Sequence, residues 1–326
     1  MLRDILRDDP QSVAVIQVIV ANSPDILLLQ GIDYDFESHA IRLLRDKISE
    51  AGLHYSHLFA ARPNSGRQTP YDLNGDGKLG GPADAQGYGR YNGQGGMAVL
   101  SRFPIDTDYI TDFSSFLWKD LPHSTLNSTR EKLFPSTAAM NAQRLSSVAH
   151  WIVPIQISPE KSLSLLAYHA GPPVFDGPED RNGIRNADET LFWVRYLDNE
   201  LGTSYAPPPK NRFVILGDAN LDPDDGEGRK VAIRGLLNHP LIFDPAPRHT
   251  TQPIDDQIGD PQLDTVEWPA PKPGNLRVDY VLPSIDLEIL GAGTFWPEAS
   301  MPDADLLSYK GINASRHRLV WVDLKM

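Results

Sequence analysis

Short runs of Val, Ile, Leu and aromatic residues, each bounded by turn-forming residues, recur along the whole chain and predict β-strands. We expect strands at Ile26 to Ile32, Met97 to Leu100, Leu145 to Ile157, Ser162 to His169, Phe213 to Leu216, Arg277 to Leu282 and Leu319 to Leu324. Apolar residues at helical spacing predict helices at Pro10 to Asn22, Ala40 to Ala51 and Gly183 to Leu201. Strands that outnumber helices and are joined by long polar connections favour two packed sheets flanked by helices.

Domain organisation follows from the absence of any shift in composition along the 326 residues. Without a second region of core composition, we expect one domain over residues 1–326. Two connections, Arg62 to Gln94 and His249 to Asn275, are longer than the ~15 residues beyond which an unstructured segment is usually functional or mobile.

Composition excludes several functional classes. With 30 Lys and Arg against 43 Asp and Glu, the formal charge is −13, so the surface repels a phosphate backbone and non-specific coating of DNA is not expected. A cationic pocket or a bound metal can still attract a phosphate ester. The lack of cysteine excludes disulfide scaffolds, thiol nucleophiles and zinc ribbons. No apolar run approaches ~18 residues, so no membrane span is expected.

The most informative local pattern is the apolar run from Phe213, which ends in Gly217, Asp218, Ala219 and Asn220. A glycine there lets the backbone approach a ligand, and the carboxylate and the amide, two residues apart, lie on the same side of an extended chain. The alternative is a turn in which Asp218 and Asn220 satisfy backbone groups.

Three other predicted strands carry chemically useful residues near an end. His169 ends one strand, Asp279 lies between Val278 and Tyr280, and His317 precedes the last strand. A carboxylate beside an imidazole fixes the tautomer of the ring and raises its basicity, which is the arrangement of an acid/base dyad. The four strand ends together predict a hydrolytic site.

These residues resemble a known family, the endonuclease/exonuclease/phosphatase superfamily. Six segments follow its motifs in order over nearly the whole chain: Pro24 to Gln30, Gly96 to Ile105, the strand ending in His169, Gly217 to Asn220, Arg277 to Val281 and Ser315 to Arg318. The resemblance implies a DNase I-like α/β fold, a four-layer α/β/β/α sandwich of two mixed sheets flanked by helices. It also implies metal-dependent hydrolysis of phosphodiesters or phosphomonoesters.

The segments Phe116 to Pro122 and Pro173 to Asn182 resemble a bacterial, commonly exported branch of the superfamily, which implies a periplasmic or secreted protein. The residues after Met1 lack the pattern of a signal peptide, so an export signal would lie upstream. We expect a monomer that acts on a phosphate-ester substrate.

The resemblance also implies roles for five residues. Asp218 would align or deprotonate the attacking water, and Asn220 would bind phosphate and water. His317 would be paired with its orienting carboxylate, Asp279, and His169 would lie across the scissile phosphate.

Three departures from the family pattern concern the metal. Gly31 replaces the metal-binding glutamate, Arg316 replaces an aspartate before the last histidine, and the family's first strand, with its asparagine, would lie upstream of Met1, so this N-terminal strand is expected to be missing. Arg316 could neutralise phosphate charge in place of part of the metal.

The remaining carboxylates near the predicted metal site are Asp33 and Asp35, which would join Asp218 as ligands of a divalent ion, Mg²⁺ or Mn²⁺. The alternative to a metal-dependent phosphodiesterase is a weakened or inactive, ligand-binding member of the same fold.

Two further patterns point to binding. Asp72, Asn74 and Asp76 precede Gly77 as in the first half of a calcium loop, which favours a structural Ca²⁺, whereas Ala83 at position twelve favours a simple polar turn.

Arg181 and Asn182 follow the His169 strand at the start of a predicted helix, where they could bind a phosphate or fix the loop by internal contacts.

Overall fold

The computed structural model describes residues 1–124, 126, 135–250, 257–269 and 272–326, so part of the predicted long connection 249–275 lies outside the described residues. The helices are α1 (Leu2–Leu6), α2 (Pro10–Asn22), α3 (His39–Glu50), α4 (Thr137–Ala142), α5 (Arg181–Leu197) and α6 (Lys230–Leu237). The strands are β1 (Ile26–Ile32), β2 (His57–Phe59), β3 (Gly96–Ser101), β4 (Thr111–Asp112), β5 (Ala149–Ser158), β6 (Lys161–His169), β7 (Phe213–Asp218), β8 (Asp279–Pro283), β9 (Glu288–Phe295), β10 (Ser308–Tyr309), β11 (Ile312–Asn313) and β12 (Leu319–Lys325).

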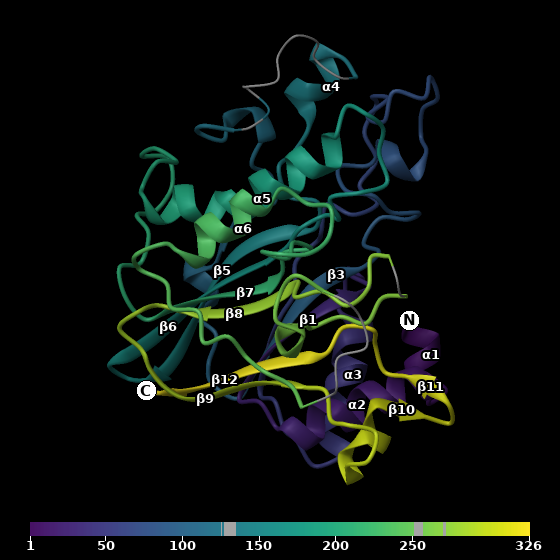
Figure 1. Ribbon diagram of the computed structural model, residues 1–326, viewed down its shortest axis with the longest axis vertical. Helices are drawn as coiled ribbons and strands as arrows, with labels where there is room; N and C mark the ends of the chain where they lie inside the picture. Colours follow the sequence, from purple (N-terminus) through teal and green to yellow (C-terminus); the bar gives the residue numbers. More distant parts are fainter. Residues whose placement is uncertain (125, 127–134, 251–256, 270–271) are drawn as a thin grey trace.

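The elements form the predicted α/β/β/α sandwich, with α5 and α6 outside one sheet layer and α2 and α3 outside the other (Figure 1). One layer is a five-stranded sheet in the order β4-β5-β6-β7-β8, in which β6 and β7 are parallel and the other pairs antiparallel. The other layer consists of two separate antiparallel sheets, β1-β3-β2 and β12-β9. The expectation of two mixed sheets is therefore correct for one layer only.

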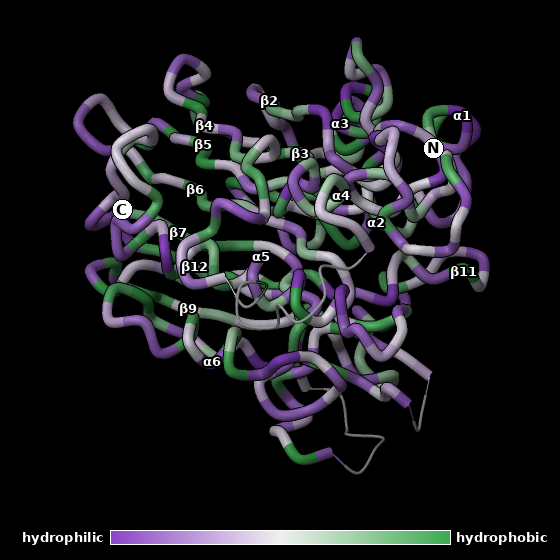
Figure 2. Tube along the Cα trace, turned by 90° about the horizontal axis from the view of Figure 1, so that it is seen from above, coloured by the Kyte–Doolittle hydropathy of each residue, from purple (hydrophilic) through white to green (hydrophobic). Residues whose placement is uncertain are grey.

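Three apolar clusters hold the four layers together. Trp193 of α5 belongs to the cluster between the outer helices and the five-stranded sheet, Trp151 of β5 to the cluster between the sheet layers, and Ile48 of α3 to the cluster beneath β1 and β3. All three side chains are fully buried. The central strands are accordingly hydrophobic along most of their length, whereas many outer loops are hydrophilic (Figure 2).

Local chemistry accounts for where several elements begin and end. Asp9 caps α2 by accepting a hydrogen bond from the Gln11 amide, and Pro10 occupies the first turn, where its missing N–H costs nothing. Helix α5 ends at Leu197 and not at Leu201, because Asn199 adopts a positive φ of 59°.

Two strands begin later than predicted because their first residues are bonded elsewhere. Residues 145–148 bond to Phe116 and Asn64, so β5 begins at Ala149 and not at Leu145. The amide of Arg277 donates to Asp222, so β8 begins at Asp279.

No helix in the described part of the chain is long and apolar enough to cross a membrane.

At Gly217 the backbone of β7 leaves no room for a side chain beside the backbone of β6. Its φ is +142°, and a Cβ atom built there would lie 1.8 Å from the carbonyl oxygen of Tyr168. Any side chain at this position would push β6 away from β7 immediately before Asp218.

We expect Gly217→Ala to lower the free energy of unfolding by more than about 3 kcal/mol, because a backbone clash adds to an unfavourable φ. Gly31→Ala is the matched control, since Gly31 also has a positive φ but open space around its Cβ position, and it should cost only about 1–2 kcal/mol. Urea unfolding measures both. Equal losses would contradict the close approach at Gly217.

Candidate active site

Sheet register brings three of the predicted residues to one edge of the five-stranded sheet. His169, the last residue of β6, pairs with Asp218, the last residue of β7, and Asp218 pairs with Asp279, the first residue of β8. Because β8 runs antiparallel to β7, its start lies at the same edge as the ends of β6 and β7.

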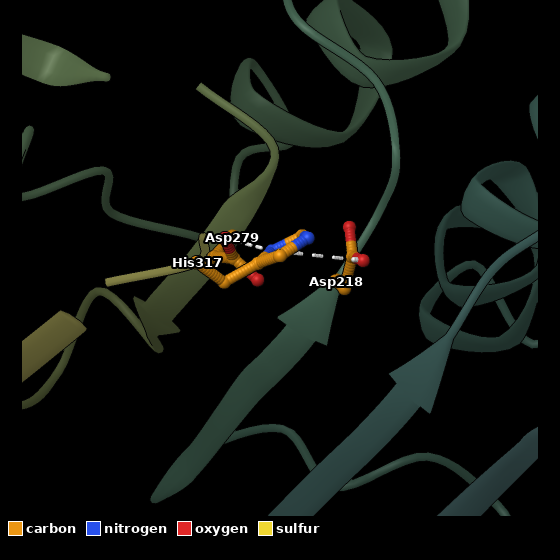
Figure 3. A group of neighbouring side chains, drawn as sticks. All are labelled: Asp218, Asp279 and His317. Atoms are coloured by element: carbon orange, nitrogen blue, oxygen red, sulfur yellow. Dashed lines mark hydrogen bonds and ion pairs between the residues drawn. The ribbon is translucent and has the colours of Figure 1, made fainter. Parts of the chain in front are cut away.

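His317 reaches this edge from the other sheet layer, where it precedes β12. The amide of Arg318 donates to Thr265, and His317 itself forms an isolated bridge with Val266. His317 Nδ1 lies 2.9 Å from Asp279 Oδ2 and 4.0 Å from Asp218 Oδ2 (Figure 3). His169 Nε2 lies 3.5 Å from the same Asp218 oxygen. The four side chains are therefore linked in series, from Asp279 through His317 and Asp218 to His169.

Asn220 orients Asp218. It adopts a left-handed conformation, and its backbone amide donates to Asp218 Oδ1 at 2.7 Å. Its Nδ2 donates to Asp218 Oδ2 at 3.0 Å and to the carbonyl of Ala170 at 2.8 Å. In this arrangement the backbone N–H and the side-chain NH₂ of Asn220 are directed at the protein.

The pKa values of the two histidines in the site are shifted in opposite directions. Burial and then the charge of Asp279 raise the pKa of the Asp218 carboxyl well above its usual range. Burial alone would lower the pKa of His317, but the charge and hydrogen bond of Asp279, with the charge of Asp218, outweigh it and raise that pKa to about 9. Burial, followed by the charge of His317, lowers the pKa of His169 to about 4. At neutral pH, His317 is thus an imidazolium and His169 a neutral imidazole.

Thr265 supports the dyad and was not found from the sequence. Its buried hydroxyl donates to Asp279 Oδ2 at 2.9 Å and accepts from the amides of Val278 and Asp279. The residue lies in a proline-rich connection with no periodicity or motif that points to it. Only its contacts reveal that it orients Asp279.

The predicted metal ligands are only partly brought together. Asp33 accepts hydrogen bonds from the Tyr91 hydroxyl at 2.7 Å and from the Gly95 amide, and Asp35 accepts from the first amides of α3. Among the described residues, the group whose ligand atoms lie within 4.8 Å of one another consists of Asp218, Asp279 and His317, without Asp33 or Asp35.

This group fits a divalent cation. Two carboxylates converge on one imidazole in a largely buried place, and the raised pKa of Asp218 reflects its burial and its repulsion from Asp279, which a cation would relieve. The two carboxylates supply the oxygen donors that suit Mg²⁺ or Mn²⁺.

Arg316 is exposed, and its guanidinium carbon lies 5.2 Å above the ring of Trp268. The Trp268 ring in turn meets the His317 ring edge-on, with centroids 5.8 Å apart. The guanidinium therefore stands one aromatic ring away from the acid/base pair.

Arg181 and Asn182, the other predicted binding residues, form hydrogen bonds within the protein. Arg181 donates to the Gln143 side chain, and the Asn182 side chain donates to the carbonyl of Val174. Both contacts fix the loop that follows β6.

In the predicted calcium loop, the side chains of Asp72 and Asp76 accept hydrogen bonds from backbone amides of the same loop. Asp72 accepts from the amides of Gly75, Asp76 and Gly77, and Asp76 accepts from Lys78. This is the geometry of a polar turn.

A family model described as "Endonuclease/Exonuclease/phosphatase family" matches residues 2–317. A search of curated protein sequences found no match.

Two solved structures resemble the chain in fold. An endonuclease/exonuclease/phosphatase from Beutenbergia cavernae DSM 12333 has 17% identity and a TM-score of 0.53, over 97% of this chain and 66% of that chain. The chain thus spans slightly less than two thirds of that protein. A beta toxin mutant from Staphylococcus aureus with bound magnesium ions has 13% identity and a TM-score of 0.50, over 99% of this chain and 95% of that chain.

We expect Asp279→Asn to lower the pKa of His317 from about 9 to near or below its ordinary value of 6.5, because the neutral amide removes the principal charge that opposes burial. NMR titration of ¹³C-labelled histidine in metal-free buffer measures this shift. Asp35→Asn is the control and should leave the His317 pKa unchanged, since Asp35 caps α3. An unchanged pKa in Asp279→Asn would refute the pairing.

Proposed function

The chain belongs to the endonuclease/exonuclease/phosphatase family of phosphoester hydrolases, and on that premise we propose that it is a metal-dependent phosphodiesterase. The observation that carries the proposal is the set of contacts at the sheet edge. His317 lies against Asp279 and near Asp218, and His169 lies near the same Asp218 oxygen. Action outside the cytoplasm, as a monomer, is part of the same proposal.

Charge balance supports a diester as substrate. At neutral pH the group contains the His317 imidazolium against the carboxyl groups of Asp218 and Asp279, and His169 adds no charge. A phosphodiester carries one negative charge, whereas a phosphomonoester carries up to two and needs more positive charge nearby. The site is therefore better matched to the diester, with a metal ion or Arg316 supplying further positive charge.

In the proposed hydrolysis, Asp218, His317 and His169 each have a separate role. Asp218, a stronger base than an ordinary carboxylate, accepts the proton of the water whose oxygen attacks phosphorus. As the bond from phosphorus to the leaving oxygen breaks, His317 protonates that oxygen from Nε2, while Asp279 holds its Nδ1. His169, which stays neutral, donates a hydrogen bond to a non-bridging oxygen.

Asp218 and Asp279 would hold the divalent ion through their carboxylate oxygens, and His317 beside them would keep both ring protons. When bound, the ion would act as a Lewis acid that polarises a phosphoryl oxygen. Asp33 and Asp35 remain candidates for contacts through water.

We expect wild-type protein to hydrolyse bis-p-nitrophenyl phosphate with Mg²⁺ or Mn²⁺, faster than p-nitrophenyl phosphate, and to stop in EDTA. His317→Ala should lower turnover by roughly 100-fold or more, because it removes the acid, and Asp279→Asn should cost less. His39→Ala, an exposed histidine on α3, is the control. Nitrophenolate release measures each rate.

Full turnover by His317→Ala would sink this mechanism. Binding of phosphate without turnover by wild type would instead support the ligand-binding alternative, which the exposed Gly31, lacking any side chain to bind metal, favours.

Arg316 is the proposed substrate-side cation. We expect Arg316→Asp to weaken binding of inorganic phosphate at least about tenfold and to tighten binding of Mn²⁺, because a carboxylate replaces a cation near His317. Calorimetric titration measures both. Arg42→Asp makes the same charge change on an exposed part of α3 and should alter neither. Equal phosphate affinity in wild type and Arg316→Asp would refute the substrate role.

A further inference from the structure

Helix α5 carries a fully buried carboxamide behind the active site. Asn186 has no exposed surface, and its Nδ2 donates two hydrogen bonds, to the carbonyl of Gly171 at 2.8 Å and to the carbonyl of Ala219 at 2.7 Å. These acceptors belong to different chain segments, which follow β6 and β7 respectively. One side chain therefore joins two loops.

Each of these loops begins at an active-site residue. Gly171 is two residues after His169, and Ala219 directly follows Asp218. The backbone pairing of β6 with β7 continues only to the bond from the Ala170 amide to the Asp218 carbonyl. Beyond it the Asn220 side chain joins the two segments at the Ala170 carbonyl, and the Asn186 carboxamide joins them at the carbonyls of Gly171 and Ala219.

Both loops are also anchored on their far sides. The Gly171 amide donates to Glu189, one turn after Asn186 on α5, at 2.9 Å. The Ala219 amide donates to the carbonyl of Val278, directly before Asp279, at 2.8 Å. The carboxamide thus closes a continuous series of bonds across the segments that carry His169, Asp218 and Asp279.

We propose that Asn186 is a positioning residue, which sets the separation between His169 and Asp218 by bridging the backbone behind them. In the described structure its Nδ2 donates to backbone carbonyls and not to either side chain, so its effect on them is transmitted through Gly171 and Ala219. Misplacement of reacting groups by about 1 Å can cost ~100-fold in rate, so a bridge of this kind matters more to chemistry than to substrate binding. The activity part of this inference rests on the proposed phosphoesterase function.

The chain contains a matched control. Asn64 is also fully buried, and its Nδ2 donates to the carbonyls of Ser114 and Ser146 at 2.7 and 2.8 Å. It makes the same kind of bridge between segments that carry none of the proposed catalytic residues. Asn64→Ala therefore reports the general cost of losing a buried bridging amide.

The experiment compares Asn186→Ala with Asn64→Ala by urea unfolding, by the ring resonances of His169 in ¹³C,¹⁵N-histidine-labelled protein, and by steady-state hydrolysis of bis-p-nitrophenyl phosphate. We expect both variants to lose stability. Only Asn186→Ala should shift the His169 ring resonances and lower kcat by about 10- to 100-fold with little change in KM. His169 resonances and kcat no more altered in Asn186→Ala than in Asn64→Ala would overturn the proposal.

Asn186→Asp keeps the proposal testable should Asn186→Ala fail to fold. A buried, protonated carboxyl offers one O–H where the amide offers two N–H donors, so it can bond only one of the two carbonyls. We expect a smaller His169 shift and an intermediate kcat. A wild-type resonance and kcat in this variant would overturn the bridging role.

The NMR readout also separates the two proposals. Failure of wild type to hydrolyse the probe would refute the proposed function, while a His169 shift confined to the Asn186 variants would still support the bridge.

Discussion

The register of three neighbouring strands governs the chemistry of this protein. Because β6 and β7 are parallel and β8 antiparallel, the residues His169, Asp218 and Asp279 lie side by side at one sheet edge. Gly217 permits the close approach of β6 and β7 directly before Asp218. A slip of one residue would turn Asp218 to the opposite face, so backbone pairing and active-site geometry cannot vary independently.

Placing carboxyl groups together in a buried site has an electrostatic cost, which the other sheet layer offsets. His317, which precedes β12, brings an imidazole against Asp279 and near Asp218. The charge and hydrogen bond of Asp279 raise the pKa of His317 against the effect of burial, whereas burial and the charge of Asp279 raise the pKa of Asp218. The two layers are thus joined at the site by charge as well as by their apolar core.

Buried polar side chains of α5 bind the backbone segments that follow β6 and β7. Asn186 and Glu189, one turn apart, bond to the carbonyl and to the amide of Gly171 respectively. Asn186 Nδ2 and the Glu189 carboxyl are buried and hydrogen-bonded, so moving either side chain would leave these groups without partners. The helix that covers the sheet therefore restrains the segments that follow the proposed catalytic residues.

The sequence by itself determined the strands and helices with strong periodicity, including both ends of β1 and α2, because apolar spacing and capping residues act locally. It also pointed to His169, Asp218, Asn220, Asp279 and His317, since each lies at or near one end of an apolar strand.

Only the tertiary structure decided which groups share the site. Asp33 and Asp35, near in sequence to the family's metal position, bond to the Tyr91 loop and to α3, whereas Thr265 and Asn186 have no local signal and act through contacts with distant residues. The physical reason is that hydrogen bonds between distant segments form only after those segments pack together. The polar residues that make them do not recur at a helical or strand spacing in the sequence.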